Sequence, residues 1–431
     1  MQSQARDWFV LAPAGCVLVI LALRVANRID LQGGFLSFLV GYMAMSAVYI
    51  LAVYYVLNHT HRAHNRRGLL AWTLIVAVAL RAIFLFTPPV LSDDIYRYVW
   101  DGRVQKEGLN PYAYAPAAPQ LEHLRDPIYE SINNKELPTI YPPMMQVVLM
   151  ASTLLSESVF GMKATFVVID LALIGILVIL LTAANLSPLR SLIYAWSPLT
   201  IVEIAGSGHN DVLMMAFLMA AHAAILLKKD TLSICLVTLA GYAKLMAFAL
   251  LPFFARWTRP LAWLAIPLTS LILLFPYRGV TRESFDGLFA YGLRWRANDS
   301  LFHFLYAITG SLDVSKLIAG VVVAALIGWL LYRRVPPLRA SYLTIGTILL
   351  MSPTVHPWYI MWLVPYLCFF PSPAWLMLTA TVALSYHAPF LAPPGEPWKE
   401  LTLFKVLEYA PFFLLAAWSA FSRKRDIVGG S

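Results

Sequence analysis

The sequence predicts an all-α, polytopic transmembrane protein with about 11–13 membrane helices, some of them broken or re-entrant, and two large extracytoplasmic loops. Composition is the first observation behind this prediction, because 60% of the 431 residues are hydrophobic and only 13% are charged. A soluble domain averages about a quarter charged residues, so this chain has too few polar side chains to face water on every side. The second observation is that apolar runs recur from end to end, which favours one integral membrane domain over residues 1–431.

The predicted spans are apolar runs close to the length of about 20 residues that crosses a bilayer core. The first run begins near the N-terminus without a small-residue cleavage site, so we expect an uncleaved anchor. The runs lie at residues 8–25, 35–57, 69–87, 143–157, 162–182, 209–227, 260–276, 316–332, 339–353, 357–370, 374–391 and 403–421.

Three clusters of basic residues orient these spans. Cytoplasmic loops are enriched in Lys and Arg, and this enrichment also explains the net charge of +9 without a nucleic-acid partner. We expect the protein in the inner (plasma) membrane. With all three clusters on its cytoplasmic side, both termini are cytoplasmic, and residues 88–142, 277–315 and 354–357 face the extracytoplasmic side. The clusters are Arg62, Arg66 and Arg67; Arg333, Arg334 and Arg339; and Arg423, Lys424 and Arg425.

Residues 190–206 and 231–254 do not form clean spans. If both crossed, Lys228 and Lys229 would lie outside; if each enters and returns, the two lysines lie inside and the turn 208–211 lies outside. Irregular backbone at membrane depth needs cover from protein or a wet cavity, so we expect a polar cavity that opens outward. The interruptions are Trp196-Ser197-Pro198 and Glu203 in the first segment, and Gly241, Lys244 and Pro252 in the second.

The densest polar stretch, residues 92–103, lies immediately outside the third span. Helix capping explains part of it, because Ser is a favoured N-cap and acids suit a first turn. The stretch nevertheless has more functional groups than capping requires. Asp93 or Asp94 is therefore a candidate general base toward a hydroxyl, and Arg97, Tyr98 and Asp101 are candidate substrate contacts.

No metal site or cofactor is predicted. Adjacent acids on a helix point about 100° apart, so Asp93 and Asp94 by themselves form a poor chelating pair. Dependence on a divalent cation is left open. The three cysteines also lack the spacing of metal ligands.

Other polar residues are candidates for binding an anionic substrate. Arg294 and Arg296 of the second loop run against the positive-inside bias, and guanidinium groups suit phosphate, although pairing with first-loop acids or lipid headgroups is the alternative. Lys244 either reaches a lipid phosphate or pairs with Glu203 or Asp170. Tyr141 and His356 are either membrane-interface residues or substrate contacts. The turn at residues 208–211 contributes three further candidate substrate contacts, His209, Asn210 and Asp211.

Six motifs follow one another between about residues 90 and 370: LSDDIYRYVWDGRVQKEGLNPYAYAP, PTIYPP, WSPLTIVEIAGSGHND, GYAKLMAFALLP, RWRAND and HPWYIMWLVP. Together they resemble the GT-C glycosyltransferases, specifically the bacterial polyprenyl-phosphate-mannose-dependent mannosyltransferases of the family 87 type. In such enzymes an acid in an outer loop acts on the acceptor hydroxyl, a role that falls by resemblance on Asp93 or Asp94, with His356 as a further site residue. That loop usually follows the first helix, so residues 8–57 are interpreted as an added N-terminal hairpin.

The resemblance implies transfer of a hexose, with mannose as the implied sugar, from a polyprenyl-phosphate donor to a glycan or glycolipid hydroxyl on the outer face. It also implies inversion, an Asp base and contact with membrane lipids. Two alternatives stay open. One is a transporter or flippase of lipid-linked sugars, since broken helices with intramembrane charge occur in transporters. The other is a glycan polymerase or ligase that uses diphosphate-linked donors, since arginines suit either phosphate form.

Overall fold

Within the residues that the computed structural model describes, eight helices are long and apolar enough to cross a membrane. Four shorter apolar helices accompany them, and the described residues contain no strand beyond an isolated bridge between Ala297 and Thr354. These features confirm the predicted all-α, polytopic membrane fold. The structure describes residues 2–28, 34–60, 67–279, 287–289, 292, 295–391 and 399–428.

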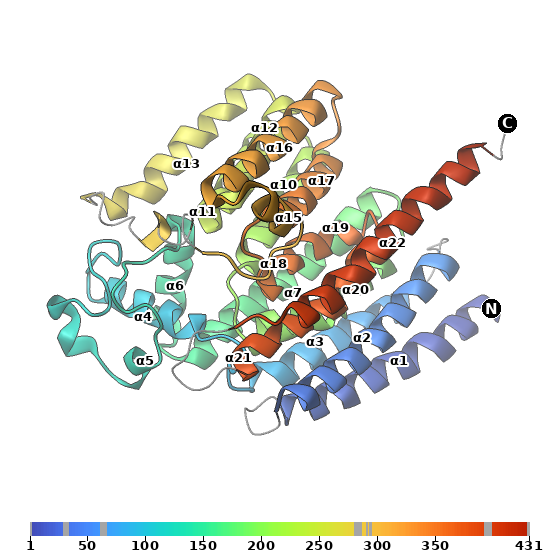
Figure 1. Cartoon of the computed structure of the whole chain (residues 1–431), viewed down its shortest axis with the longest axis horizontal. Helices are drawn as coiled ribbons and strands as arrows, with labels where there is room; N and C mark the ends of the chain where they lie inside the picture. The colour runs from blue at the N-terminus through green and yellow to red at the C-terminus, as the bar shows by residue number, and fades with distance from the viewer. Residues whose placement is uncertain are drawn as a thin grey trace.

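The N-terminal helices α1 (Gln2–Ala26), α2 (Gly34–His59) and α3 (Arg67–Leu85) run side by side along the bundle (Figure 1). Tyr42 and Tyr49 of α2 donate hydrogen bonds to the carbonyls of Thr379 (2.8 Å) and Ile193 (2.7 Å). The predicted hairpin at residues 8–57 is thus bonded to segments from the middle and the end of the chain. Both chain termini lie at one end of the bundle.

The first polar loop lies at the opposite end from the termini (Figure 1). It forms α4 (Asp94–Lys106), η1 (Pro119–Leu124) and α5 (Pro127–Glu130), and it leads into α6 (Pro143–Leu155). The sequence predicts a span at residues 143–157, but α6 packs along α4 instead. A Cβ atom on Gly102 of α4 would lie only 2.7 Å from the Leu149 carbonyl oxygen of α6. The 13 residues of α6 cover about 20 Å, less than the ~30 Å of a bilayer core.

Helix α7 (Val159–Ala183) begins at the α4 end of the bundle. Lys163, in its first turns, donates hydrogen bonds to the carbonyls of Phe84 (3.0 Å) and Thr87 (2.6 Å), where α3 ends. Both ends of α6 therefore stay at the same end of the bundle, and this helix does not cross.

The segment after α7 is broken as predicted, but it does not enter and return. It runs from the far end of α7 to Gly208, where a Cβ atom would meet the side chains of Ile95 and Lys163. Because this segment runs from one end of the bundle to the other and α6 does not, Lys228 and Lys229 still fall at the end that holds the termini. The broken pieces are η2 (Pro188–Ser191), α8 (Leu192–Ala195), α9 (Pro198–Thr200) and the π-helix η3 (Ile201–Gly206).

The second interrupted segment is the predicted re-entrant hairpin. After α10 (Val212–Leu226), the chain forms α11 (Asp230–Ala243) and returns through η4 (Leu245–Leu250) and α12 (Leu251–Arg256). Arg259 Nε lies 3.0 Å from Asp230 Oδ2, which places the start and the end of the hairpin side by side. Its tip, Lys244, lies 2.8 Å from Asp211 at the α4 end of the bundle.

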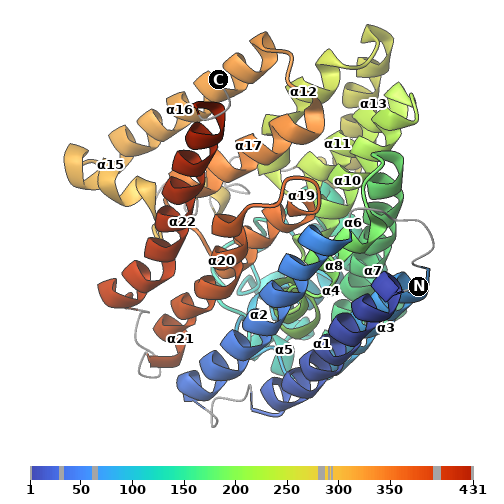
Figure 2. The same cartoon turned by 90° about the vertical axis from the view of Figure 1, so that its right-hand side faces the viewer.

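The last part of the chain packs around the hairpin and closes the bundle. In Figure 2, α15, α16 and α22 lie on the opposite side from α1 and α3. The elements are η5 (Pro260–Leu264), α13 (Ala265–Leu274), η6 (Phe275–Tyr277), α15 (Leu301–Thr309), α16 (Leu312–Tyr332), α17 (Pro337–Met351), α18 (Pro357–Ile360), η8 (Met361–Leu363), α19 (Val364–Leu367), α20 (Pro373–Thr381), η9 (Val382–Tyr386), α21 (His387–Leu391) and α22 (Thr402–Val428).

Candidate active site

A pocket of about 380 Å³ opens beside the first turn of α4. We call it the α4 pocket. Its walls come from α4, residues 133–142, the tip of the α11–η4 hairpin and residues 348–362. The pocket therefore brings together parts of the chain that are far apart in sequence. The predicted site residues that line it are Asp93, Asp94, Arg97, Tyr98, Tyr141, Lys244 and His356.

The two acids occupy different positions in this pocket. Asp93 is the N-cap residue of α4, but its side chain caps no backbone amide and instead accepts a hydrogen bond from Asn133 Nδ2 at 2.5 Å. Asp94 is the first helical residue. The pKa of Asp94 is raised to about 6, chiefly by burial and further by the charge of Asp93, while the charge of Lys244 opposes the shift. A carboxylate with that pKa is ionised at neutral pH and still basic enough to take a proton.

Lys244, the tip of the hairpin, pairs with neither of the two predicted acids, Glu203 and Asp170. Its Nζ lies 2.8 Å from Asp211 Oδ1 and sits over the rings of Tyr359 and Trp362, at 4.9 and 5.6 Å from their centroids. Trp362 Nε1 donates to the same Asp211 oxygen at 2.7 Å. Lys244 is thus held in place while its side chain stays 23% exposed to the pocket.

The other two acids considered for Lys244 have different partners. Asp170 pairs with Arg81 at 2.5 Å, deep among α3 and α7. Glu203 accepts a hydrogen bond from the Tyr386 hydroxyl and lies 3.3 Å from His209 Nε2. Neither carboxylate reaches the α4 pocket.

The rings of His356 and Trp358 form one wall of the pocket, and His209 stacks behind them. His356 lies against Trp358 with ring centroids 4.4 Å apart and planes 5° apart, and His209 lies against Trp358 at 3.9 Å and 19°. His356 lines the pocket, whereas His209 is fully buried and does not. Burial and the charge of Lys244 lower the pKa of His356 to about 3, so its imidazole is neutral at physiological pH.

The turn 208–211 lies behind this wall rather than in it. His209, Asn210 and Asp211 are all at least 99% buried and none lines the pocket. Within the part of the chain that the structure describes, neither polar atom of the Asn210 amide has a hydrogen-bond partner. Of the three predicted substrate contacts in this turn, Asp211 comes nearest to the pocket, through Lys244.

Asp101 supports the pocket from the far side of α4. It is buried and accepts hydrogen bonds from Arg97 Nε (2.8 Å), Thr139 Oγ1 (2.5 Å) and Gln146 Nε2 (3.0 Å). It orients Arg97, which lines the pocket and also donates to the Leu137 carbonyl at 3.0 Å. Asp101 itself does not line the pocket.

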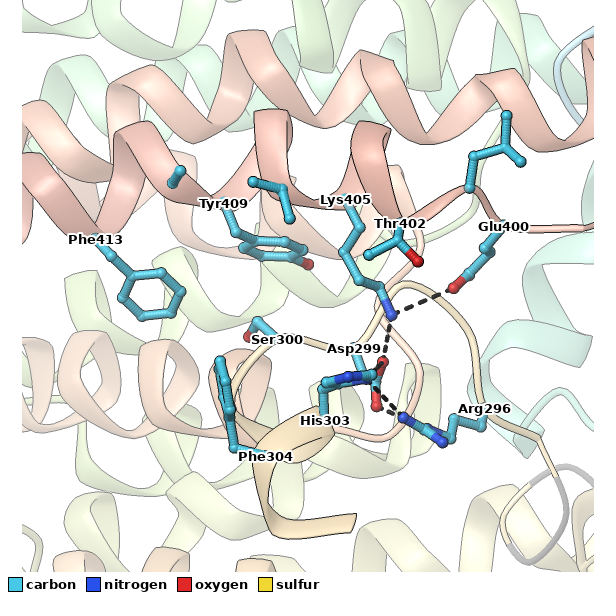
Figure 3. A pocket seen from close by; sticks show the side chains of 13 residues that line it. Arg296, Asp299, Ser300, His303, Phe304, Glu400, Thr402, Lys405, Tyr409 and Phe413 are labelled. Carbon is cyan, nitrogen blue, oxygen red and sulfur yellow. Dashed lines mark hydrogen bonds and ion pairs between the residues drawn. The ribbon is translucent and has the colours of Figure 1, made fainter. Parts of the chain in front are cut away.

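The two arginines predicted in the second loop do not join the α4 pocket. Arg294 lies outside the described residues. Arg296 lines a separate groove, shown in Figure 3, where its Nε lies 2.7 Å from Asp299. The arginine therefore pairs with an acid of its own loop rather than with the acids of the first loop.

Sequence reasoning missed Asn133 and the aromatic residues Trp358, Tyr359 and Trp362, which all line the pocket. The aromatic residues recur at helical spacing after His356, which is a signal for one shared face. Asn133 carries no local signal. Over the described residues, no group of three or more His, Cys, Asp or Glu side chains is placed to hold a metal ion.

A family model described as "Alpha-(1->6)-mannopyranosyltransferase, N-terminal domain" matches residues 16–260, more than half of the chain. The chain belongs to this family. A second model, described as "MptB C-terminal domain", matches residues 301–423. This match confirms the predicted resemblance to a mannosyltransferase family of the GT-C type. It also confirms the prediction that the family is one of glycosyltransferases.

The chain is also similar to Alpha-(1->6)-mannopyranosyltransferase A of Mycobacterium tuberculosis, with 24% identity over 329 residues. The aligned part is 65% of this chain and 62% of the relative, so the chain spans less than two thirds of the relative's length. The first family match contains Asp93, Asp94 and Lys244, and the second contains His356. Both matched parts therefore contribute walls to the α4 pocket.

Proposed function

We propose that the protein is an inverting membrane mannosyltransferase that moves mannose from a polyprenyl-phosphate donor to a hydroxyl of a glycan or glycolipid acceptor. The observation that carries the proposal is the α4 pocket, which is lined both by Asp94, from the start of α4, and by Lys244, from the tip of the hairpin. A base for the acceptor and a cation for the phosphate are the two groups that this reaction needs. The choice of mannose as the transferred sugar rests on the description of the family to which the chain belongs.

In the proposed step, Asp94 accepts the proton of the acceptor hydroxyl as that oxygen attacks the anomeric carbon. The bond between the anomeric carbon and the phosphate oxygen breaks, and the phosphate leaves with the electron pair toward Lys244 and Arg97. A single displacement inverts the anomeric centre, so a β-linked donor yields an α-linked product. The name of the Mycobacterium relative specifies an alpha linkage, which supports this stereochemistry.

Asp93 has a different proposed role. Its hydrogen bond with Asn133 ties the start of α4 to the loop that leads to Tyr141. Asp93 also raises the pKa of Asp94 through its charge. We therefore assign Asp93 as a positioning residue and Asp94 as the base.

The proposed location of the reaction is the extracytoplasmic face. The α4 pocket lies at the end of the bundle opposite both termini (Figure 1). Arg259 and Arg333 lie in connections at the end that holds the termini, as a cytoplasmic placement of that end requires.

The test is transfer of labelled mannose from polyprenyl-phosphate mannose by the purified full-length protein in lipid nanodiscs. Asp94→Asn is expected to abolish transfer, and Glu130→Gln, an exposed acid of the same loop, is expected to leave it unchanged. Full transfer by a well-folded Asp94→Asn variant would refute the base assignment. Movement of the donor across proteoliposomes without covalent transfer would favour a transporter instead.

A further inference from the structure

A groove of about 610 Å³ lies between α15 and α22, apart from the α4 pocket. We call it the α22 groove. Figure 3 shows Tyr409 and Phe413 of α22 facing Phe304 of α15 across it. Phe304 and Val406, which both line the groove, are 61% and 54% exposed. Only 17% of the most apolar stretch of α22 is buried, although this helix is long enough to span the membrane. The groove therefore opens sideways toward the lipid phase.

The end of the groove next to the second loop is polar. Asp299, only 1% exposed, holds Arg296 Nε at 2.7 Å and also pairs with Lys405 Nζ, which reaches across from α22 (Figure 3). Arg296 Nη2 donates to His303 Nδ1 at 2.9 Å. The carboxylate is hidden beneath the two cations, whose side chains are 27% and 18% exposed. The groove thus has two partly exposed cations, both paired with Asp299, at one end and apolar side chains along its length.

One competing charge stands at this polar end. Glu400 lies 3.3 Å from Lys405, is itself 36% exposed, and accepts a hydrogen bond from the backbone amide of Asn298 through its other oxygen. A partly exposed ion pair of this kind contributes less stability than a buried one. An incoming phosphate can therefore replace Glu400 as a partner of Lys405 while Asp299 keeps the lysine in place.

The segment that carries Arg296 and Asp299 is fixed from several sides. Asn298 Nδ2 donates to Glu408 Oε1 at 2.8 Å, and Tyr409 donates to the Asn298 carbonyl at 2.8 Å. The backbone of Ala297 is bridged to that of residues 353–355. Groups that are held before a ligand arrives lose less entropy on binding. The cations are therefore organised for an anion in advance.

The same segment is the wall between the two cavities. Trp295 lines the α4 pocket and Arg296, the next residue, lines the α22 groove. On the partner strand of the bridge, Val355 precedes His356 of the α4 pocket. A ligand of the groove would therefore lie beside the proposed reaction centre.

We propose that the α22 groove is a docking site that holds the long-chain isoprenoid phosphate carrier before it reaches the α4 pocket, with the phosphate on Arg296 and Lys405 and the chain along α15 and α22. Arginine and lysine form strong charge-assisted hydrogen bonds with phosphate, and the single apolar groove suits one chain rather than the two of a phospholipid. The identity of the carrier rests on the function proposed above, whereas the preference for a lipid phosphate rests on the groove alone.

The experiment uses the full-length protein in nanodiscs and a polyprenyl phosphate with a photoreactive group in its chain, followed by peptide mapping. Labelling is expected on α15 and α22. The double variant Arg296→Gln/Lys405→Gln should lower it about tenfold, the effect of losing about 1.4 kcal/mol of binding. Glu400→Gln should raise it. Lys106→Gln, which removes a half-exposed lysine paired with Glu157, is the matched control and should not change it.

A second variant guards against misfolding, because the double variant leaves Asp299 buried without its cations. Ala410→Phe narrows the groove and keeps the charge cluster, and it should also reduce labelling. Labelling of both variants, each well folded, at the level of the unmodified protein would overturn the proposal. Equally strong labelling by a phosphatidylglycerol probe, or by the polyprenol without phosphate, would overturn it too.

Failure of the docking proposal can be distinguished from failure of the proposed transferase function. Asp94→Asn should lose transfer and keep the labelling of α15 and α22. If the unmodified protein is labelled there but transfers no mannose, the proposed function fails and the lipid-phosphate site stands.

Discussion

The indole of Trp358 lies parallel to the imidazole of His356, with ring centroids 4.4 Å apart and planes 5° apart. The buried His209 also stacks on this indole, and it in turn lies beside Glu203. The orientation of a pocket residue is therefore set by residues behind the wall. Aromatic stacking of this kind adds about 0.5–1.5 kcal/mol to what burial provides.

Replacing this indole should disturb the pocket more than it disturbs the fold. Trp358→Leu is expected to lower kcat/KM about tenfold, because His356 loses the ring that orients it. A tenfold loss corresponds to about 1.4 kcal/mol of transition-state stabilisation. Trp375→Leu is the matched control: it removes an equally buried indole that packs on Phe412 away from the pocket. If both variants lose the same activity at equal thermal stability, the stack has no specific role.

The pH dependence of transfer should report the ionisation of Asp94. With a pKa of about 6, the base is protonated below that pH, so log kcat/KM should fall by about one per pH unit on the acid side. The rate should be flat from pH 7 until another group titrates. A profile without an acid limb near pH 6 would contradict the assignment of Asp94.

Two variants should shift that acid limb in opposite directions. Asp93 raises the pKa of Asp94 and Lys244 lowers it. Asp93→Asn is therefore expected to move the midpoint to lower pH, and Lys244→Met should move it to higher pH, whatever each does to the rate itself. Midpoints that move in the same direction would show that one of the two charges does not act on Asp94.

Lys244 also has a structural role that can be separated from its chemical one. Removing it leaves Asp211, 99% buried, with Trp362 as its remaining hydrogen-bond donor. Breaking such a pair costs about 3 kcal/mol, so Lys244→Met should lower the melting temperature. Lys244→Met/Asp211→Asn should recover stability but not transfer. Recovery of both would mean that Lys244 only neutralises Asp211.

The contact between α4 and α6 predicts a strict requirement at Gly102. A Cβ atom there would lie 2.1 Å from Thr153 Oγ1 and 2.7 Å from the Leu149 carbonyl oxygen. Gly102→Ala should therefore push the helices apart, lowering the melting temperature and reducing transfer. Gly175→Ala in α7, where a Cβ atom meets nothing within 4 Å, should preserve both. Normal activity of Gly102→Ala would show that α4 moves without consequence.

The sequence by itself determined the features that depend on local chemistry. The long apolar runs predict the membrane helices, because a polar backbone in lipid is stable only as helix or closed barrel. The interruptions at Gly241, Lys244 and Pro252 predict the hairpin break, since each disfavours a continuous apolar span. The acids at the start of α4 stand out for the same local reason. Lys244 and His356 were also identified as candidates without knowledge of the fold.

Only the tertiary structure decided which of these groups meet. Helix α6 is apolar enough to suggest a span, yet Gln146 finds Asp101 on α4, and the helix is too short to cross. Lys244 pairs with Asp211 rather than with Asp170 or Glu203, and His209 lies behind Trp358. Each outcome depends on how helices rotate and pack across long sequence separations. Hydropathy and local motifs carry no information on that rotation.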